Sequence, residues 1–238
     1  MRVFKAFLWV VIAVCLANIF WIVAGRPHMT AQEAQTLREE YTRPAASSAP
    51  CEAAADEPDI DFAALQQQYP DIKAWLTIPG TVVDYPVLQS GADDPEHYLR
   101  RNYDHEWRMA GSLFFQFDCT PQSRNLVIYG HNMNDGSMFG VLKEMLDEDF
   151  LREHAALTLE TPEGVRNYKI VAAMKTDINQ IPFTRVDFAG DEDFLSFAGQ
   201  LLQTSGYTAD QEDRLLTLVT CAYDWEGART VVVAVETE

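Results

Sequence analysis

The sequence predicts a mainly β protein: a closed eight-stranded β-barrel with one helix before it and another in a long insertion late in the chain. Eight short runs rich in β-branched and aromatic residues are separated by turns rather than by regular helices. Many short strands of this kind are typical of barrels, because closure removes the exposed sheet edges. The predicted strands are residues 74–78, 82–87, 112–117, 125–130, 156–159, 165–175, 214–221 and 229–235.

Residues 1–25 are predicted to be a single-pass transmembrane anchor. Residues 6–24 carry no charged side chain, and a bilayer-spanning helix needs roughly 20 apolar residues. Arg2 and Lys5 precede this segment, which predicts a cytoplasmic N-terminus and an extracellular folded domain at the cell membrane. Removal of the segment as a signal peptide is the alternative.

Residues 26–58 are predicted to be an extracellular linker, and residues 59–238 a single folded domain. The first half of the linker has partly helical composition. Residues 43–50 combine Pro, Ala and Ser and lack the apolar side chains that a core requires. The remaining chain is long enough to bury a core of its own.

Three helices are predicted within the folded domain. The first begins near Asp59 and is stopped by Pro70, which cannot continue a helix. The second occupies residues 191–203 and packs on the barrel. The third is short and is capped by Ser137. The helical spacing of the first rests on Phe62, Leu65 and Tyr69. The apolar positions predicted to lie in the core are Phe194, Phe197, Ala198, Leu201 and Leu202 in the second helix, and Met138, Val141, Leu142 and Met145 in the third.

Composition and cysteine spacing exclude several classes of function. The chain has 36 acidic and 18 basic residues, and an acidic surface argues against binding to nucleic acid or to an anionic lipid surface. The sequence contains no CxxC motif, no paired-histidine motif and no calcium loop, so we expect no metal and no cofactor. We also expect no disulfide, although an external protein could join Cys51 to Cys119. The four cysteines are Cys15, Cys51, Cys119 and Cys221.

Cys221 is the candidate nucleophile. The run TLVTC (217–221) and the apolar run that begins after Arg229 predict two antiparallel strands joined by a seven-residue turn. The hairpin returns Arg229 to the level of Cys221. A thiol with a guanidinium in reach can attack a carbonyl carbon beside a donor for the developing oxyanion. On its own, the pair is more typical of a half-buried cysteine beside a solvated arginine.

His131 is the histidine whose setting matches that of Cys221. It follows the predicted strand 125–130, at a turn rich in Asn and Gly. An imidazole near a thiol can protonate a departing amine and later deprotonate an incoming one. The other histidines, near the N-terminal segment or in polar loops and helices, are His28, His97, His105 and His154.

The motif YGHNMNDGSMF (129–139), followed far downstream by TLVTC (217–221) and Arg229, resembles the signature of the class B sortases. Sortases are membrane-anchored cysteine transpeptidases of Gram-positive bacteria. The similarity extends from about Asp61 to the C-terminus. It implies a sortase-type barrel whose long insertion before the cysteine strand carries the helix that separates class B from the smaller class A. Two further matching motifs are WLTIPG (75–80) and VDYPV (83–87).

The resemblance implies three catalytic residues. Cys221 would be the nucleophile, His131 the general acid and base, and Arg229 the group that stabilises the oxyanion and positions the substrate. The implied reaction cleaves a sorting motif of Leu-Pro-x-Thr-Gly or Asn-Pro-x-Thr-Asn type, after Thr, near the C-terminus of a secreted protein. The thioacyl-enzyme would then pass that protein to an amine of a peptidoglycan precursor or to a pilin lysine.

Two positions depart from the class B pattern. Val219 stands where a serine is common, and residues 90–95 lack the asparagine expected there. Both differences bear on peptide specificity rather than on the chemistry. The sequence offers no clear buried acid that could orient His131, because Asp224 and Glu226 belong to a hairpin turn, where acids are usually solvated.

Two alternatives remain open from the sequence. A membrane-tethered cysteine peptidase that only hydrolyses would use the same residues, whereas a catalytically silent surface binding module would not need them. With ordinary pKa values of about 8.5 for Cys221 and 6.5 for His131, the thiolate–imidazolium state would hold roughly 1% of the molecules at pH 7. We therefore expect a slow enzyme whose rate depends on two ionisations.

Overall fold

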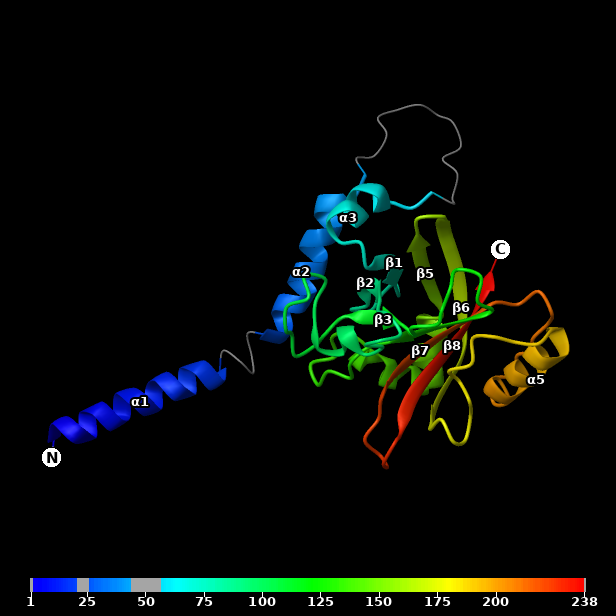
Figure 1. Ribbon diagram of the computed structural model, residues 1–238. Helices are drawn as coiled ribbons and strands as arrows, with labels where there is room; N and C mark the ends of the chain where they lie inside the picture. The colour runs from blue at the N-terminus through cyan, green and yellow to red at the C-terminus, as the bar shows by residue number, and fades with distance from the viewer. Residues whose placement is uncertain (1, 21–25, 44–56, 238) are drawn as a thin grey trace.

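The predicted barrel is present in the computed structural model, which describes residues 2–20, 26–43 and 57–237 (Figure 1). Around the barrel the described strands follow the order β1-β2-β3-β4-β7-β8-β6-β5, and β5 pairs with β1 to close it. The predicted fold class is therefore confirmed. The strands are β1 (Ile72–Thr77), β2 (Asp84–Gln89), β3 (Leu113–Phe115), β4 (Asn125–Tyr129), β5 (Ala156–Thr161), β6 (Gly164–Thr176), β7 (Leu215–Cys221) and β8 (Arg229–Thr237).

The strand pairing determines which residues can meet. Among the described strands, β2 lies parallel to β3 and β4 lies parallel to β7, and the other neighbouring pairs are antiparallel. Parallel neighbours run in the same direction, so their C-terminal ends lie at the same level of the sheet. The β4–β7 pair thus brings together two strand ends that are far apart in the sequence.

Alternating side chains divide each strand between the barrel interior and its outer face. In β4, Leu126 and Ile128 join the interior cluster, whereas Val127 packs in a second cluster on the outer face. α5 (Asp191–Leu201) contributes the fully buried Phe194 and Phe197 to that outer cluster, and Figure 1 shows this helix beside the barrel. The packing helix predicted at residues 191–203 is confirmed.

α3 (Phe62–Gln68) lies where the sequence predicts a helix before the first strand. The carboxylate of Asp61 accepts a hydrogen bond from the backbone N–H of Ala64 at 3.0 Å and so caps the helix. Phe62 and Leu65 are buried against β1 and β2 in a third cluster. The helix ends just ahead of the proline that predicted its end.

α2 (Arg26–Tyr41) lies where the sequence predicted the first part of a linker. Ala34 and Leu37 are buried, and Arg38 donates hydrogen bonds of 2.8 Å to both Asp84 and Glu160. This part of the predicted linker is therefore a docked helix. Two buried apolar residues one turn apart and one arginine hold this helix against the barrel. The rest of the helix is polar, so its sequence does not show the wider apolar stripe of a typical packed helix. Residues 44–56 of the predicted linker lie outside the described residues.

α1 (Arg2–Phe20) includes most of the segment predicted to be a membrane anchor. Within the described residues, no helix has both the length and the apolar character needed to cross a membrane. Residue 1 and residues 21–25 of the predicted segment lie outside the described residues.

The predicted helix cap at Ser137 is wrong. The turn that follows is a 3-10 helix, η3 (Gly140–Leu146), without a side-chain cap, and the Ser137 hydroxyl donates to Asp135 at 2.7 Å. The Asp135 carboxylate, two residues earlier, accepts this hydrogen bond within a local turn, so the hydroxyl does not cap a helix. A helix that was not predicted, α4 (Glu148–Glu153), follows and is capped by Asp147. The predicted core residues Met138, Leu142 and Met145 are buried, and Val141 packs against them.

Candidate active site

Cys221 and Arg229 face each other across the β7–β8 hairpin. The two strands pair with Cys221 opposite Arg229, as the turn length predicted. The backbone N–H of Ala222 donates to the carbonyl of Ala228 at 3.0 Å, which closes the base of the turn. Both side chains are half-buried. The thiol and the guanidinium therefore lie at one level on neighbouring strands.

His131 reaches this level on the other side of β7. β4 and β7 pair in parallel, with Tyr129 opposite Val219. Side chains repeat every second residue along a strand, so His131 and Cys221 follow that pair on the same face. The strand period and the parallel pairing together explain why residues so far apart in the sequence become neighbours.

Cross-strand hydrogen bonds hold these two strand ends together. The Thr220 hydroxyl donates to the carbonyl of Gly130, and the Asn132 side-chain amide donates to the carbonyl of Cys221, both at 2.7 Å. Gly130 has no room for a side chain, because an added Cβ would lie 2.5 Å from a side-chain carbon of β3. Glycine at this position thus lets the backbone before His131 approach the neighbouring strand closely.

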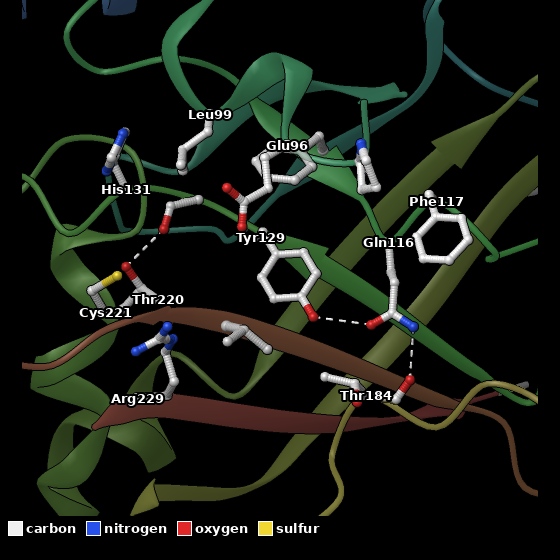
Figure 2. Close-up of a pocket in the computed structure, with 14 residues that line it drawn as sticks. Glu96, Leu99, Gln116, Phe117, Tyr129, His131, Thr184, Thr220, Cys221 and Arg229 are labelled. Atoms are coloured by element: carbon white, nitrogen blue, oxygen red, sulfur yellow. Dashed lines mark hydrogen bonds between the residues drawn. The ribbon is translucent and has the colours of Figure 1, made fainter. Parts of the chain in front are cut away.

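The three predicted site residues lie at one end of a groove of about 440 Å³ on the outer face of β4 and β7 (Figure 2). The segment that contains Glu96 and Leu99 forms one wall. This volume is in the range of pockets that bind small molecules and peptide side chains. The structure therefore brings Cys221, His131 and Arg229 into a single cavity.

Arg229 carries a positive charge that no carboxylate neutralises within the described part of the chain. Its guanidinium donates to the carbonyl of Ala228 at 2.9 Å and forms no ion pair there. Burial raises the pKa of Tyr129, and the charge of Arg229 acts on this phenol in the opposite direction, which places that charge near the groove. A guanidinium in this position is available to an anionic oxygen beside Cys221.

Burial lowers the pKa of His131 below its ordinary value of 6.5. The positive charge of Arg100 acts in the same direction, whereas a hydrogen bond with the backbone of Leu99 opposes both. The buried Nε2 has no hydrogen-bond partner among the described residues. His131 is therefore neutral at pH 7, and the thiolate–imidazolium state is rarer than ordinary pKa values imply.

A chain of hydrogen bonds that the sequence did not reveal closes the far end of the groove (Figure 2). The Tyr129 hydroxyl donates to the Gln116 side-chain carbonyl at 2.9 Å, and the Gln116 amide donates to the carbonyl of Thr184 at 2.8 Å. Tyr129 could have been found, since it lies two residues before His131 on the same strand. Gln116 and Thr184 carry no local signal, because the fold alone makes them neighbours.

Pro95 and Val219, at the two departures from the class B pattern, both line the groove. Val219 presents a hydrocarbon surface beside Cys221, and Pro95 presents another on the opposite wall. Glu96 follows and adds a negative charge that sequence reasoning missed; Figure 2 shows its carboxylate among the groove residues. These side chains can therefore influence which peptides fit.

Asp224 and Glu226 do not line the groove. The carboxylate of Asp224 binds the Lys175 ammonium group at 2.7 Å, and both acids are exposed. This pairing agrees with the expectation that turn acids face solvent. Neither acid therefore reaches the imidazole of His131.

The other cysteines differ from Cys221 in their surroundings. Cys15 and Cys119 are free, and Cys51 lies outside the described residues. Burial raises the pKa of Cys119 to about 12, and its sulfur contacts the backbone of Val127 rather than the groove. Cys119 is therefore protonated and unreactive at neutral pH.

Comparisons with known proteins agree with this architecture. The sortase domain family matches residues 76–237. Sortase B of Listeria monocytogenes is 37% identical over 177 residues, which cover 71% of this chain and 70% of that protein. Sortase B of Staphylococcus aureus is 32% identical over 181 residues, with 73% of each chain covered. The crystal structure of sortase B from B. anthracis in complex with AAEK1 has a TM-score of 0.73 and 30% identity, and covers 90% of this chain and 98% of that one.

Proposed function

Because the chain belongs to the class B sortases, a family of cysteine transpeptidases, we propose that it cleaves a C-terminal sorting motif after threonine and transfers the cleaved protein to an amine. The observation that carries the proposal is the meeting of Cys221, His131 and Arg229 in one groove. The secreted protein would bear a motif of Leu-Pro-x-Thr-Gly or Asn-Pro-x-Thr-Asn type. The acceptor would be a peptidoglycan precursor or a pilin lysine.

In the first half of the proposed reaction, the thiolate of Cys221 attacks the threonine carbonyl carbon and a tetrahedral oxyanion forms. Arg229 donates hydrogen bonds to this oxyanion. His131, as imidazolium, protonates the departing amine, the C–N bond breaks, and a thioester to Cys221 remains. Thiolate and imidazolium must coexist for this step, and the lowered pKa of His131 makes their coexistence rare, which predicts slow turnover.

In the second half, an amine replaces the thiol. Neutral His131 takes a proton from the incoming amine, whose nitrogen attacks the thioester carbonyl carbon. Arg229 again stabilises the oxyanion. The C–S bond breaks, an amide forms, and the Cys221 thiolate is restored. Water could take the place of the amine, so partition between amine and water separates a transpeptidase from a hydrolase.

A peptide assay tests the proposal. Purified protein is incubated with peptides of both motif types, with and without triglycine or a lysine peptide, and products are identified by mass spectrometry. We expect cleavage after threonine and a ligated product that requires the amine. Cleavage with water alone as acceptor, even at high amine concentration, would identify a hydrolase.

The same assay addresses a silent binding module. Cys221→Ala keeps the shape of the groove while it removes the sulfur, and Cys119→Ala is the matched control on a buried thiol. We expect the first variant to lose all product and the second to keep it. Product formation by Cys221→Ala would contradict the proposed mechanism.

A further inference from the structure

A second cavity lies at the opposite end of the barrel from Cys221 and Arg229. Its volume, about 660 Å³, exceeds the roughly 440 Å³ of the groove. Arg214 and Glu236, at the start of β7 and near the end of β8, line it, whereas Cys221 and Arg229 lie at the other ends of these strands. The two cavities share no lining residue.

The inner wall of this barrel-end cavity is the barrel interior. Phe115, Leu126 and Leu159 line the cavity and belong to the buried interior cluster. The interior of an eight-stranded barrel is either filled by side chains or holds one small ligand, and barrel mouths are frequent ligand sites. The cavity therefore offers an apolar surface to the hydrocarbon part of a ligand.

Two basic side chains of the lining have no acidic partner in the part of the chain that the structure describes. Lys73 donates to the carbonyl of Pro70 at 2.6 Å, and Arg214 donates to the carbonyl of Pro121 at 3.4 Å. Neither forms an ion pair there. Both retain donors that an anion could use.

The remaining charges of the lining nearly balance. Arg166 binds both carboxylate oxygens of Glu236, at 2.7 and 2.6 Å, so this pair is neutral as a unit. Glu163 is the other acid of the lining. A local excess of positive charge therefore remains in a chain whose net charge is −18. Such an excess favours an anionic ligand.

Tyr168, which does not itself line the cavity, has a buried hydroxyl without a partner among the described residues. Its side chain is only 2% exposed, and the Arg166 guanidinium lies 5.4 Å from its ring centroid. Burial raises the pKa of Tyr168, and the charges of Arg166, Glu236 and Arg214 also act on it, so the hydroxyl lies near three lining residues.

We propose that the barrel-end cavity binds a small organic monocarboxylate with an apolar body. The carboxylate accepts hydrogen bonds from one of the two unpaired cations, Lys73 or Arg214, which lie on opposite sides of the barrel end, and the hydrocarbon part packs on Phe115, Leu126 and Leu159. Binding there is separate from the reaction at Cys221, because the cavity lies at the other ends of β7 and β8 and shares no lining residue with the groove. The site thus adds a ligand-binding function to the proposed transpeptidase.

Titration of the full chain with decanoate, followed by calorimetry and by backbone chemical shifts, tests the proposal. We expect one saturable site with a dissociation constant on the order of 0.1 mM and shift changes around Leu126 and Arg166. Decyltrimethylammonium, with the same tail and the opposite charge, should bind at least tenfold more weakly. Because the pairing is electrostatic, decanoate binding should also weaken as salt rises.

Variants separate this site from the groove. Lys73→Glu combined with Arg214→Glu should weaken decanoate binding at least tenfold, while Arg152→Glu, an exposed arginine elsewhere, and Arg229→Ala, in the groove, should not. Retained peptide cleavage by the double variant shows that it is folded. The proposal is overturned by the absence of saturable binding, by shift changes around His131 instead, or by equal binding of the two amphiphiles. Unchanged affinity in the double variant also overturns it.

Discussion

Arg229 places a full positive charge beside a thiol, and no carboxylate in the described residues neutralises it. Removal of one oxyanion donor typically lowers kcat about 10²–10³-fold. We therefore expect Arg229→Ala to slow thioester formation by about that factor, while Arg229→Lys recovers part of the rate because it keeps the charge without the planar donor pair. Single-turnover kinetics with a sorting peptide measures both variants. A loss below about threefold in Arg229→Ala would contradict the assigned role.

The lowered pKa of His131 leads to a specific prediction for how kcat/KM depends on pH. Burial and the charge of Arg100 lower its pKa below 6.5, so the acidic limb of kcat/KM should have its midpoint below pH 6.5. Arg100→Gln removes one of these causes and should move the midpoint upward. It should also raise the maximal rate, because a more basic imidazole increases the thiolate–imidazolium population.

Rate profiles between pH 5 and 9 check this pair of effects. Arg152→Gln, which removes an exposed arginine from α4, is the control and should leave the profile unchanged. A downward shift of the acidic limb in Arg100→Gln would contradict the electrostatic account of His131.

At the scale of elements, α2 makes a testable contribution to stability. Arg38 reaches Asp84 and Glu160, and the Glu160 side chain is almost fully buried. The backbone N–H groups of Asp59 and Ile60 bind one oxygen of this carboxylate, so removal of Arg38 leaves the other oxygen without its partner. We therefore expect Arg38→Ala to lower the free energy of unfolding by about 1–3 kcal/mol. Urea denaturation measures the change, and Arg152→Ala should alter it by less than about 0.5 kcal/mol. Equal stability of Arg38→Ala and the parent would show that α2 is not held by this contact.

The elements also show where local sequence patterns suffice. Residues 191–203 repeat apolar side chains at helical spacing, and the hairpin from Cys221 to Arg229 is set by its own turn, so both could be predicted. The partly helical composition of the α2 segment was predicted, but its docking could not be, because it depends on Asp84 and Glu160, which are distant in the sequence. The prediction that Ser137 caps a helix failed for the opposite reason. A hydroxyl at a helix start resembles a cap, but this hydroxyl donates its hydrogen bond to the nearby Asp135.

At the scale of the whole molecule, the site is a product of topology. Local patterns place His131 and Cys221 at strand ends, but the parallel pairing of β4 with β7 makes them neighbours. Such long-range pairing leaves no periodic signal in one sequence, and only the resemblance to sortases anticipated it. The wall with Glu96 and the contact from Gln116 to Thr184 were missed for the same reason.

The most direct test of the central claim is the mass of the covalent intermediate. Intact-mass and peptide-mapping spectrometry after a brief reaction with a sorting peptide should show one added acyl group, lost on addition of an amine and located on Cys221. Cys119→Ala should form the same adduct, because burial keeps the Cys119 thiol protonated, with a pKa of about 12. An adduct on Cys119, or none on Cys221 while the peptide is cleaved, would contradict the account.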